Sequence, residues 1–474
     1  MRWRIILSSW FKQSKNIKLI GGLLLSLISC IFFIIPPFPG LTRPAMNYLG
    51  VFLLIIILMM VHFVADYIII ILGLMLMVVV GVGKFQEVFS LFGDTFFWNL
   101  IGIFGFSAGV TNSGLLKRLT NKTFSIFPNT INGQVTAIFI TGLILSPLIP
   151  SVTAKMTLLA SFAVVIAQEY GYHKSSREAI ALYLAMYLSG YVFGLAFSTG
   201  GTSAAIIIGM LEKQNLNFGS YLANTILWLI LIAGLFYIIL LSMFHNSQNS
   251  QVLTTVSSHK DLGPMSSNEK FTVWVLIIAL SFWIFGPLFN IPSYLVGIVA
   301  LCTFLIQGTL STKDFRGKIS WDMVILITGF MSTAKLLTDL NIDTWLAQSM
   351  APVLEPVVNN IFLFIPILSL LVVIVRTFVV SEVACMSIFY ALFAKPCSQV
   401  GISPFIILFI TLIISQTWHM SYNQMGIDAA AAATDDSLVT YHDIRKYSFI
   451  YIGLCILIFE LCIPLWHLTG MLKL

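Results

Sequence analysis

Charge is the scarcest feature of this sequence. Only 9% of its 474 residues are Asp, Glu, Lys or Arg, whereas 58% are hydrophobic. Soluble globular chains carry about 25% charged residues, and a chain of this length has too much surface to cover with so few. The composition therefore predicts an integral membrane protein and argues against a soluble enzyme. The net charge of +6 is interpreted as an orientation signal rather than as nucleic-acid binding.

Motifs of enzymes and metal sites are also missing. The six cysteines include no CxxC pair, and the seven histidines include no HExxH pair. The one GxSxG match, Gly105 to Gly109, lies inside the apolar run at 96–115, not at the strand-to-helix turn that the hydrolase motif requires. Metalloprotease and serine hydrolase chemistry therefore find no support, and we expect neither an enzyme nor a structural metal site.

Long apolar runs fill the sequence instead. A helix that crosses hydrocarbon needs about 20 mainly apolar residues, and the chain contains enough such runs for about eleven transmembrane helices. The predicted spans cover residues 19–36, 45–62, 65–83, 96–115, 178–210, 220–243, 271–287, 291–308, 320–338, 404–432 and 446–467.

Two further apolar stretches, 132–170 and 359–396, are too long for one helix. The first is interrupted at 146–153 and the second at 376–382 by polar, charged or proline residues. Two full spans each would fit their length, but the interrupted centres favour a hairpin that enters and leaves the membrane on one side. Most Lys and Arg between the spans then fall on one face, so we expect the N-terminus in the cytoplasm.

The chain also repeats itself. Residues 151–157 and 381–387 both read S-x-x-A-x-M-[S/T], and Trp98-Asn99 and Gly105-Phe106 are matched by Trp321-Asp322 and Gly329-Phe330. Residues 198–203 and 417–424 form a second polar or glycine-rich interruption after each hairpin. Inverted repeats with broken helices are the architecture of secondary transporters, whose sites lie near the membrane midplane.

This pattern divides the chain into four parts. Residues 1–90 would form an N-terminal cytoplasmic segment with scaffold helices, and 91–243 the first repeat with its hairpin at 132–170. Residues 244–269, rich in Ser, Asn and Gln, would be a cytoplasmic linker. Residues 270–474 would form the second repeat with its hairpin at 359–396.

From about residue 90 to 467 the chain resembles the divalent anion/sodium symporter family. That family carries a Ser-Asn-Thr triplet at each hairpin tip, and the corresponding triplets here are Ser151-Val152-Thr153 and Ser381-Glu382-Val383. The segments 112–115 and 443–446 and residue Trp321 also look typical. Both asparagines are replaced, which puts sodium use and substrate choice in question.

The resemblance implies eleven helices, two opposed re-entrant hairpins, a dimeric scaffold and a transport domain that moves like an elevator. It also implies a substrate site between the two tips and the two later interruptions, with hydroxyl and backbone N–H groups on carboxylate oxygens and backbone carbonyls around any cation. The candidate substrate-binding residues are Ser151, Val152, Thr153, Lys155, Thr202, Ser203, Ser381, Glu382, Val383 and Ser421. The candidate cation-binding residues are Ser146, Ser151, Gly200, Gly201, Thr377 and Glu382.

Three charged residues stand near the tips. A lysine at membrane depth costs about 2.5–3.5 kcal/mol unless it has a partner or a cavity. Lys155 would supply fixed positive charge for an anion, pair with Glu382, or reach toward the interface. Glu382 would be paired, protonated, a cation ligand or a proton carrier. Arg376 would bind the anion, pair with Glu382, or lie at the hairpin base.

These features predict a secondary transporter of small di- or tricarboxylates such as succinate, malate or citrate, by cation symport or anion exchange. A carrier of sulfate or another inorganic anion, or a channel or antiporter of the wider superfamily, is the alternative. We expect no cofactor beyond Na⁺ or H⁺ as a coupling ion, and as partners the anionic substrate, membrane lipid and a second copy in a homodimer. The expected location is the inner membrane.

Overall fold

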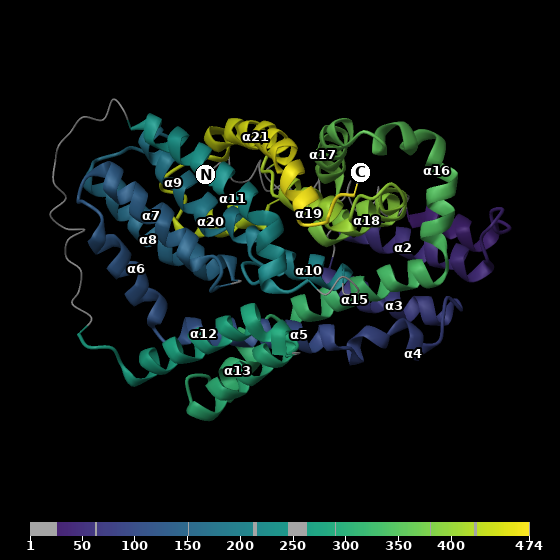
Figure 1. Cartoon of the computed structure of the whole chain (residues 1–474), viewed down its shortest axis with the longest axis horizontal. Coiled ribbons are helices and arrows are strands. Elements are labelled where there is room, and N and C mark those ends of the chain that lie inside the picture. The colour runs from purple at the N-terminus through teal and green to yellow at the C-terminus, as the bar shows by residue number, and fades with distance from the viewer. Residues whose placement is uncertain are drawn as a thin grey trace, which may run out of the picture.

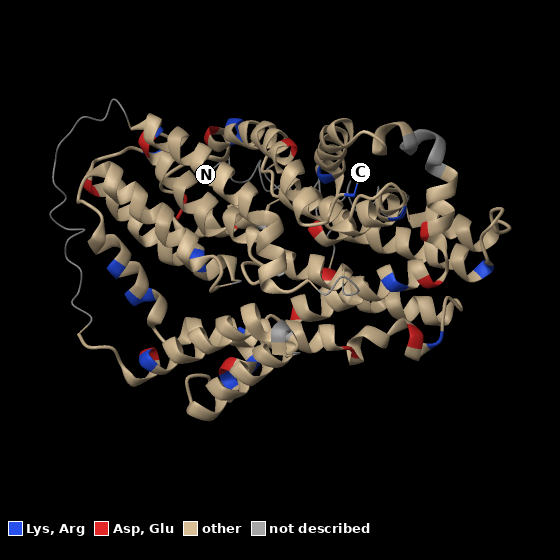
Figure 2. Ribbon diagram, viewed as in Figure 1, with Lys and Arg blue, Asp and Glu red and all other residues tan. Residues whose placement is uncertain are grey.

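The computed structural model describes residues 26–61, 64–149, 151–211, 216–244, 263–289, 291–379, 381–420 and 424–473. Within these residues the chain is helical, and its only β-type pairing is an isolated bridge between Ile402 and Leu472. The prediction of an all-α polytopic membrane protein is confirmed. Charged residues are sparse and gather mainly toward helix ends (Figure 2).

The helices form two layers (Figure 1). In the lower layer of that view, α5 packs along α13 and α15 packs along α3. The upper layer holds the two hairpins with α9, α11, α19 and α21. In residues 43–126 and 267–358 the helices are α2 (Arg43–Val61), α3 (Asp66–Val79), α4 (Phe85–Val88), α5 (Thr95–Asn112), α6 (Leu115–Ile126), α12 (Ser267–Phe285), α13 (Ser293–Gln307), α14 (Thr312–Lys318), α15 (Trp321–Asp339) and α16 (Ile342–Val358). Of these, α6 and α16 run between the two layers at opposite ends of the view (Figure 1). In residues 131–243 and 361–468 the helices are α7 (Ile131–Leu145), α8 (Val152–Glu169), α9 (Arg177–Gly190), α10 (Thr202–Met210), α11 (Phe218–Met243), α17 (Ile361–Phe378), α18 (Glu382–Gln399), α19 (Pro404–Ser415), α20 (Met425–Ala433) and α21 (Tyr441–Leu468).

Seven helices in the described residues are long and apolar enough to cross a membrane, or eight if α14 and α15, bent by 52°, count as one span. Shorter apolar helices accompany them. The count of eleven spans therefore stays a prediction. The segments predicted as continuous spans at 178–210 and 404–432 are each divided, the first into α9, the 3₁₀ turn η2 (Val192–Ala196) and α10, the second into α19 and α20.

The division has a local cause. Gly200-Gly201 stands in the first gap and Gln416-Thr417 in the second. Gly200 lies so close to the chain before it that a Cβ there would be 1.9 Å from the Gly194 carbonyl oxygen. A glycine is needed at such a contact because any side chain would displace the backbone. The interruption predicted at 198–203 overlaps the start of α10, and the one predicted at 417–424 falls between α19 and α20, with residues 421–423 outside the described residues.

Both hairpins are built in the same way. Each second arm begins at a serine whose hydroxyl caps the helix, because Ser151 accepts a hydrogen bond from the Ala154 N–H and Ser381 from the Ala384 N–H, both at 3.4 Å. Serine is a favoured N-cap for this reason. The break in the second hairpin, predicted at 376–382, is shorter than predicted, since Arg376 and Thr377 are still within α17.

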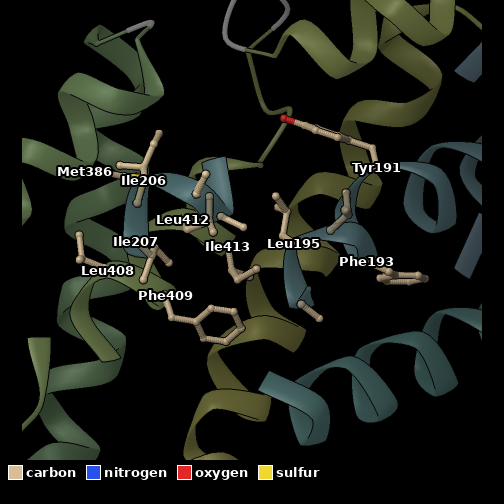
Figure 3. Packing of buried hydrophobic residues seen from close by; sticks show 14 of the residues in the cluster. Tyr191, Phe193, Leu195, Ile206, Ile207, Met386, Leu408, Phe409, Leu412 and Ile413 are labelled. Atoms are coloured by element: carbon tan, nitrogen blue, oxygen red, sulfur yellow. The ribbon is translucent and has the colours of Figure 1, made fainter. Parts of the chain in front are cut away.

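Apolar packing joins the two halves at the broken helices. Figure 3 shows Ile206 and Ile207 of α10 beside Met386 of α18 and Leu408 of α19, and all four side chains are buried. Within a membrane such contacts are stabilised by van der Waals packing, because lipid tails are as apolar as these side chains. This contact holds the first interruption against the second hairpin.

Candidate substrate-binding site

The first hairpin tip presents hydroxyl groups. Ser151 and Thr153 are exposed, while Val152 between them is half-buried. The tip opens α8, so the free N–H groups of the first turn of the helix lie beside these hydroxyls, an arrangement that favours anions. The two predicted polar residues of this tip are therefore exposed at a helix N-terminus, and their binding of an anion stays a prediction.

Lys155 lies one turn further along α8 and is fully buried. Its Nζ donates a hydrogen bond to the Gly200 carbonyl at 2.9 Å, inside the first interruption. The interpretation that this lysine extends to the interface is wrong, because a buried ammonium needs acceptors and the freed carbonyl of the broken helix supplies one.

Ser146 and Gly194 complete the surroundings of this ammonium. A Cβ built on Gly194 would lie 3.0 Å from Lys155 Nζ and 3.3 Å from Ser146 Oγ. The Ser146 hydroxyl itself donates to the Ser189 carbonyl at 2.9 Å. Of the residues predicted to bind a cation, Ser146 and Gly200 are thus brought together around a lysine of the chain itself.

The second tip presents a carboxylate. Glu382 accepts a hydrogen bond from Ser203 Oγ at 3.0 Å on Oε2 and one from Gln416 Nε2 at 2.6 Å on Oε1. Because Ser203 belongs to α10, this contact brings the first interruption to the second tip. Among the described residues, Lys155 and Glu382 form no ion pair with each other, so the paired alternative for Lys155 does not hold in this structure.

Arg376 lies behind this tip, only 2% exposed. Its Nε donates to the Ser415 carbonyl at 3.2 Å and its Nη1 to the Val379 carbonyl at 2.9 Å. Ser415 is the last residue of α19 and Val379 follows α17. Arg376 therefore does in the second half what Lys155 does in the first, because each places a positive charge on carbonyls at a helix break.

The other predicted residues lie as follows. Thr377 donates to the Val373 carbonyl at 3.0 Å, and its hydroxyl lies 3.1 Å from His419 Nε2.

Gly201 is the buried N-cap of α10, and Ser381 and Val383 are buried at the second tip. Thr202 begins α10, but its side chain and the whole of Ser421 lie outside the described residues. The roles of all these residues stay predictions.

Sequence reasoning missed a buried amide network. Gln416 Oε1 accepts from the Tyr191 hydroxyl at 2.7 Å and from Gln424 Nε2 at 3.0 Å. Gln416 also donates to Glu382, so these hydrogen bonds connect the carboxylate at the second tip with Tyr191 and Gln424. Two glutamines at either end of an interruption in an apolar run were a usable signal, because buried amides require partners.

Known proteins resemble this chain over most of its length. A chloroplastic protein of Spinacia oleracea, named dicarboxylate transporter 1, is 23% identical over 410 residues, which is 82% of this chain and 70% of that protein. The inner membrane protein YbhI of Escherichia coli is 24% identical over 95% of this chain and 97% of its own length. A putative malate transporter of Bacillus subtilis, YflS, is 22% identical over 72% of this chain and 73% of its own length.

Solved structures agree in fold. The YdaH transporter of Alcanivorax borkumensis superposes with a TM-score of 0.59 at 14% sequence identity, covering 90% of this chain and 99% of that one. MtrF of Neisseria gonorrhoeae gives a TM-score of 0.55, also at 14% identity, over 92% of this chain and 97% of that one. Residues 15–472 match the family described as the sodium:sulfate symporter transmembrane region. The chain therefore belongs to this family of membrane transporters, which confirms the resemblance to the divalent anion/sodium symporters over most of its length.

Proposed function

We propose that this protein exchanges small dicarboxylates, such as succinate or malate, across the inner membrane without using sodium. The observation that carries the proposal is the pair of buried basic side chains at the helix breaks. Lys155 and Arg376 donate to carbonyls at helix breaks, where a transporter with broken helices would hold a coupling cation. Basic side chains of the protein in these two places would make a coupling Na⁺ unnecessary.

The proposal also accounts for anion binding. A dicarboxylate carries two negative charges, and its carboxylates would meet the hydroxyls of Ser151 and Thr153 with the charge of Lys155 one turn behind them. Charges in a site shielded from water interact more strongly than in bulk solvent. The printed names of relatives from spinach and Bacillus, which denote dicarboxylate and malate transporters, support this substrate class.

Fixed charges favour exchange over net transport. An empty site in which only Glu382 offsets the charges of Lys155 and Arg376 is costly to carry through the membrane, whereas a bound dianion supplies the missing negative charge. We further propose that the protein works as a homodimer in lipid with a cytoplasmic N-terminus, and that one rigid body moves against the other as in an elevator.

Uptake into proteoliposomes tests the proposal. Vesicles loaded with unlabelled succinate should take up labelled succinate or malate, and vesicles loaded with an inert salt should take up little. Labelled citrate and sulfate, added in parallel, measure selectivity. Uptake that needs no internal dicarboxylate, or uptake of sulfate alone, would contradict the proposed exchange of dicarboxylates.

A further inference from the structure

A cavity of about 250 Å³ lies beside the first hairpin tip. It is bounded by α5, by the start of α8 and by the corner between α14 and α15, so it lies between the two helical layers of Figure 1. We name it the vestibule. Its described lining residues are Phe104, Ser107, Ala108, Thr111, Ser151, Ala154, Lys318 and Ser320.

The lining has the chemistry of an anion site. Ser107, Thr111, Ser151 and Ser320 provide four hydroxyl groups, and Lys318 is the one charged residue among the described lining residues. Hydroxyls around a single ammonium can donate several hydrogen bonds to one carboxylate. Since Ser151 belongs both to the vestibule and to the candidate site, an anion held here is already next to the first tip.

Lys318 is held in place but still accessible. Its Nζ forms an ion pair with Asp314 Oδ1 at 2.8 Å and also donates to Asn112 Oδ1. Its side chain is 45% exposed. An ammonium has three N–H donors, so one remains for a ligand while Asp314 and Asn112 fix its position.

Asp314 would oppose a bound anion. Its carboxylate is the same chemical group as the one a substrate would bring, and it lies against the same ammonium. Asp314 also accepts hydrogen bonds from the Ser311 N–H at 2.9 Å and the Ser311 hydroxyl at 2.7 Å, which keep it at the start of α14. A substrate carboxylate at Lys318 must therefore share the ammonium with a carboxylate of the protein.

We propose that the vestibule is an access subsite, where Lys318 holds one carboxylate of the substrate before it reaches Ser151 and Thr153. The inference rests on the proposed function and adds a residue, Lys318, that sets the affinity for the substrate at one face of the membrane only. The charge distribution of the sequence assigns α14, with Lys313, Arg316 and Lys318, to the cytoplasm. The vestibule would then be the route from the cytoplasmic side.

The test is the KM for succinate measured separately at each membrane face. Inside-out vesicles report the cytoplasmic face and right-side-out vesicles the opposite one. Lys318→Gln should raise the cytoplasmic KM roughly ten-fold, because a charge-assisted hydrogen bond to the substrate is lost. Asp314→Asn, which removes the competing charge, should lower that KM by roughly three-fold. Neither change should alter the KM at the opposite face or the maximal rate.

A second pair in the same chain supplies the control. Lys335 and Asp339 have the same residue types and the same spacing, with atoms 3.8 Å apart, but lie on α15 away from the vestibule. Lys335→Gln and Asp339→Asn should leave both KM values unchanged.

Shifts of KM in opposite directions in Lys318→Gln and Asp314→Asn would show that Lys318 binds the substrate and does not merely stabilise the protein through its ion pair. A merely structural pair would change KM in the same direction for both variants, or change the maximal rate, and either result would overturn the access subsite. A wild-type protein that exchanges no dicarboxylate would overturn the proposed function and the subsite together. Exchange with unchanged KM in Lys318→Gln would overturn the subsite alone.

Discussion

Lys155 combines two roles that its hydrogen bond to Gly200 makes separable. The ammonium satisfies a backbone carbonyl freed by the helix break, and it also places a positive charge at the first tip. A glutamine amide can still donate to the carbonyl but carries no charge, whereas methionine can do neither. Comparing the two substitutions therefore distinguishes charge from structural support.

For Lys155→Gln we expect a folded protein whose succinate exchange is at least roughly ten-fold slower, because the fixed charge is lost. Lys155→Met should lose exchange as well and also lose about 1–3 kcal/mol of stability, since the Gly200 carbonyl is left unsatisfied. Exchange rates and thermal unfolding of the purified protein measure both effects. Wild-type exchange by Lys155→Gln would show that the charge is dispensable.

Glu382 is the other unusual residue, because its carboxylate stands at a tip that would receive a dianion. Its contacts with Ser203 and Gln416 hold it there. In Glu382→Gln the repulsion is removed while an acceptor for Ser203 remains, so we expect the KM for succinate to fall severalfold. The KM of the wild type and that of the variant are also compared over a range of pH. An identical pH profile in both proteins would exclude any proton-carrying role of Glu382.

At the scale of elements, the sequence predicts where helices break better than what the broken ends contact. The repeated S-x-x-A-x-M pattern located Ser151 and Ser381, and both serines are helix caps in the structure. Capping depends on a few neighbouring residues and is readable locally. The partners of Lys155 and Arg376 lie 45 and 39 residues away, and sequence order alone does not determine such contacts.

The packing of α5 against α13 gives an element-scale prediction. A Cβ on Gly102 would lie 2.8 Å from the backbone of Gly297, where no side chain can give way. We expect Gly102→Ala to destabilise the protein by about 1–3 kcal/mol, the usual effect of overpacking. Gly234→Ala in α11, where nothing lies within 4 Å, is the matched control and should not destabilise. Thermal unfolding compares them, and equal stability of both variants would contradict the close packing.

At the scale of the whole molecule, composition and apolar runs were enough to predict an all-α polytopic membrane protein, because membranes restrict chains to few architectures. The separate lengths of the spans were less predictable. Helices such as α6 and α16 were not anticipated, because short or amphipathic helices beside long apolar ones resemble loops in hydropathy. The arrangement of the two layers, and hence the vestibule between them, required the three-dimensional structure.

The central claim is that buried side chains of the protein take the place of coupling sodium ions. The most direct test is succinate exchange in proteoliposomes with Na⁺ replaced by choline on both sides of the membrane. Because Lys155 and Arg376 are permanent parts of the site, the exchange rate should be the same in choline as in sodium. A rate that falls to background in choline and returns with added Na⁺ would contradict the account.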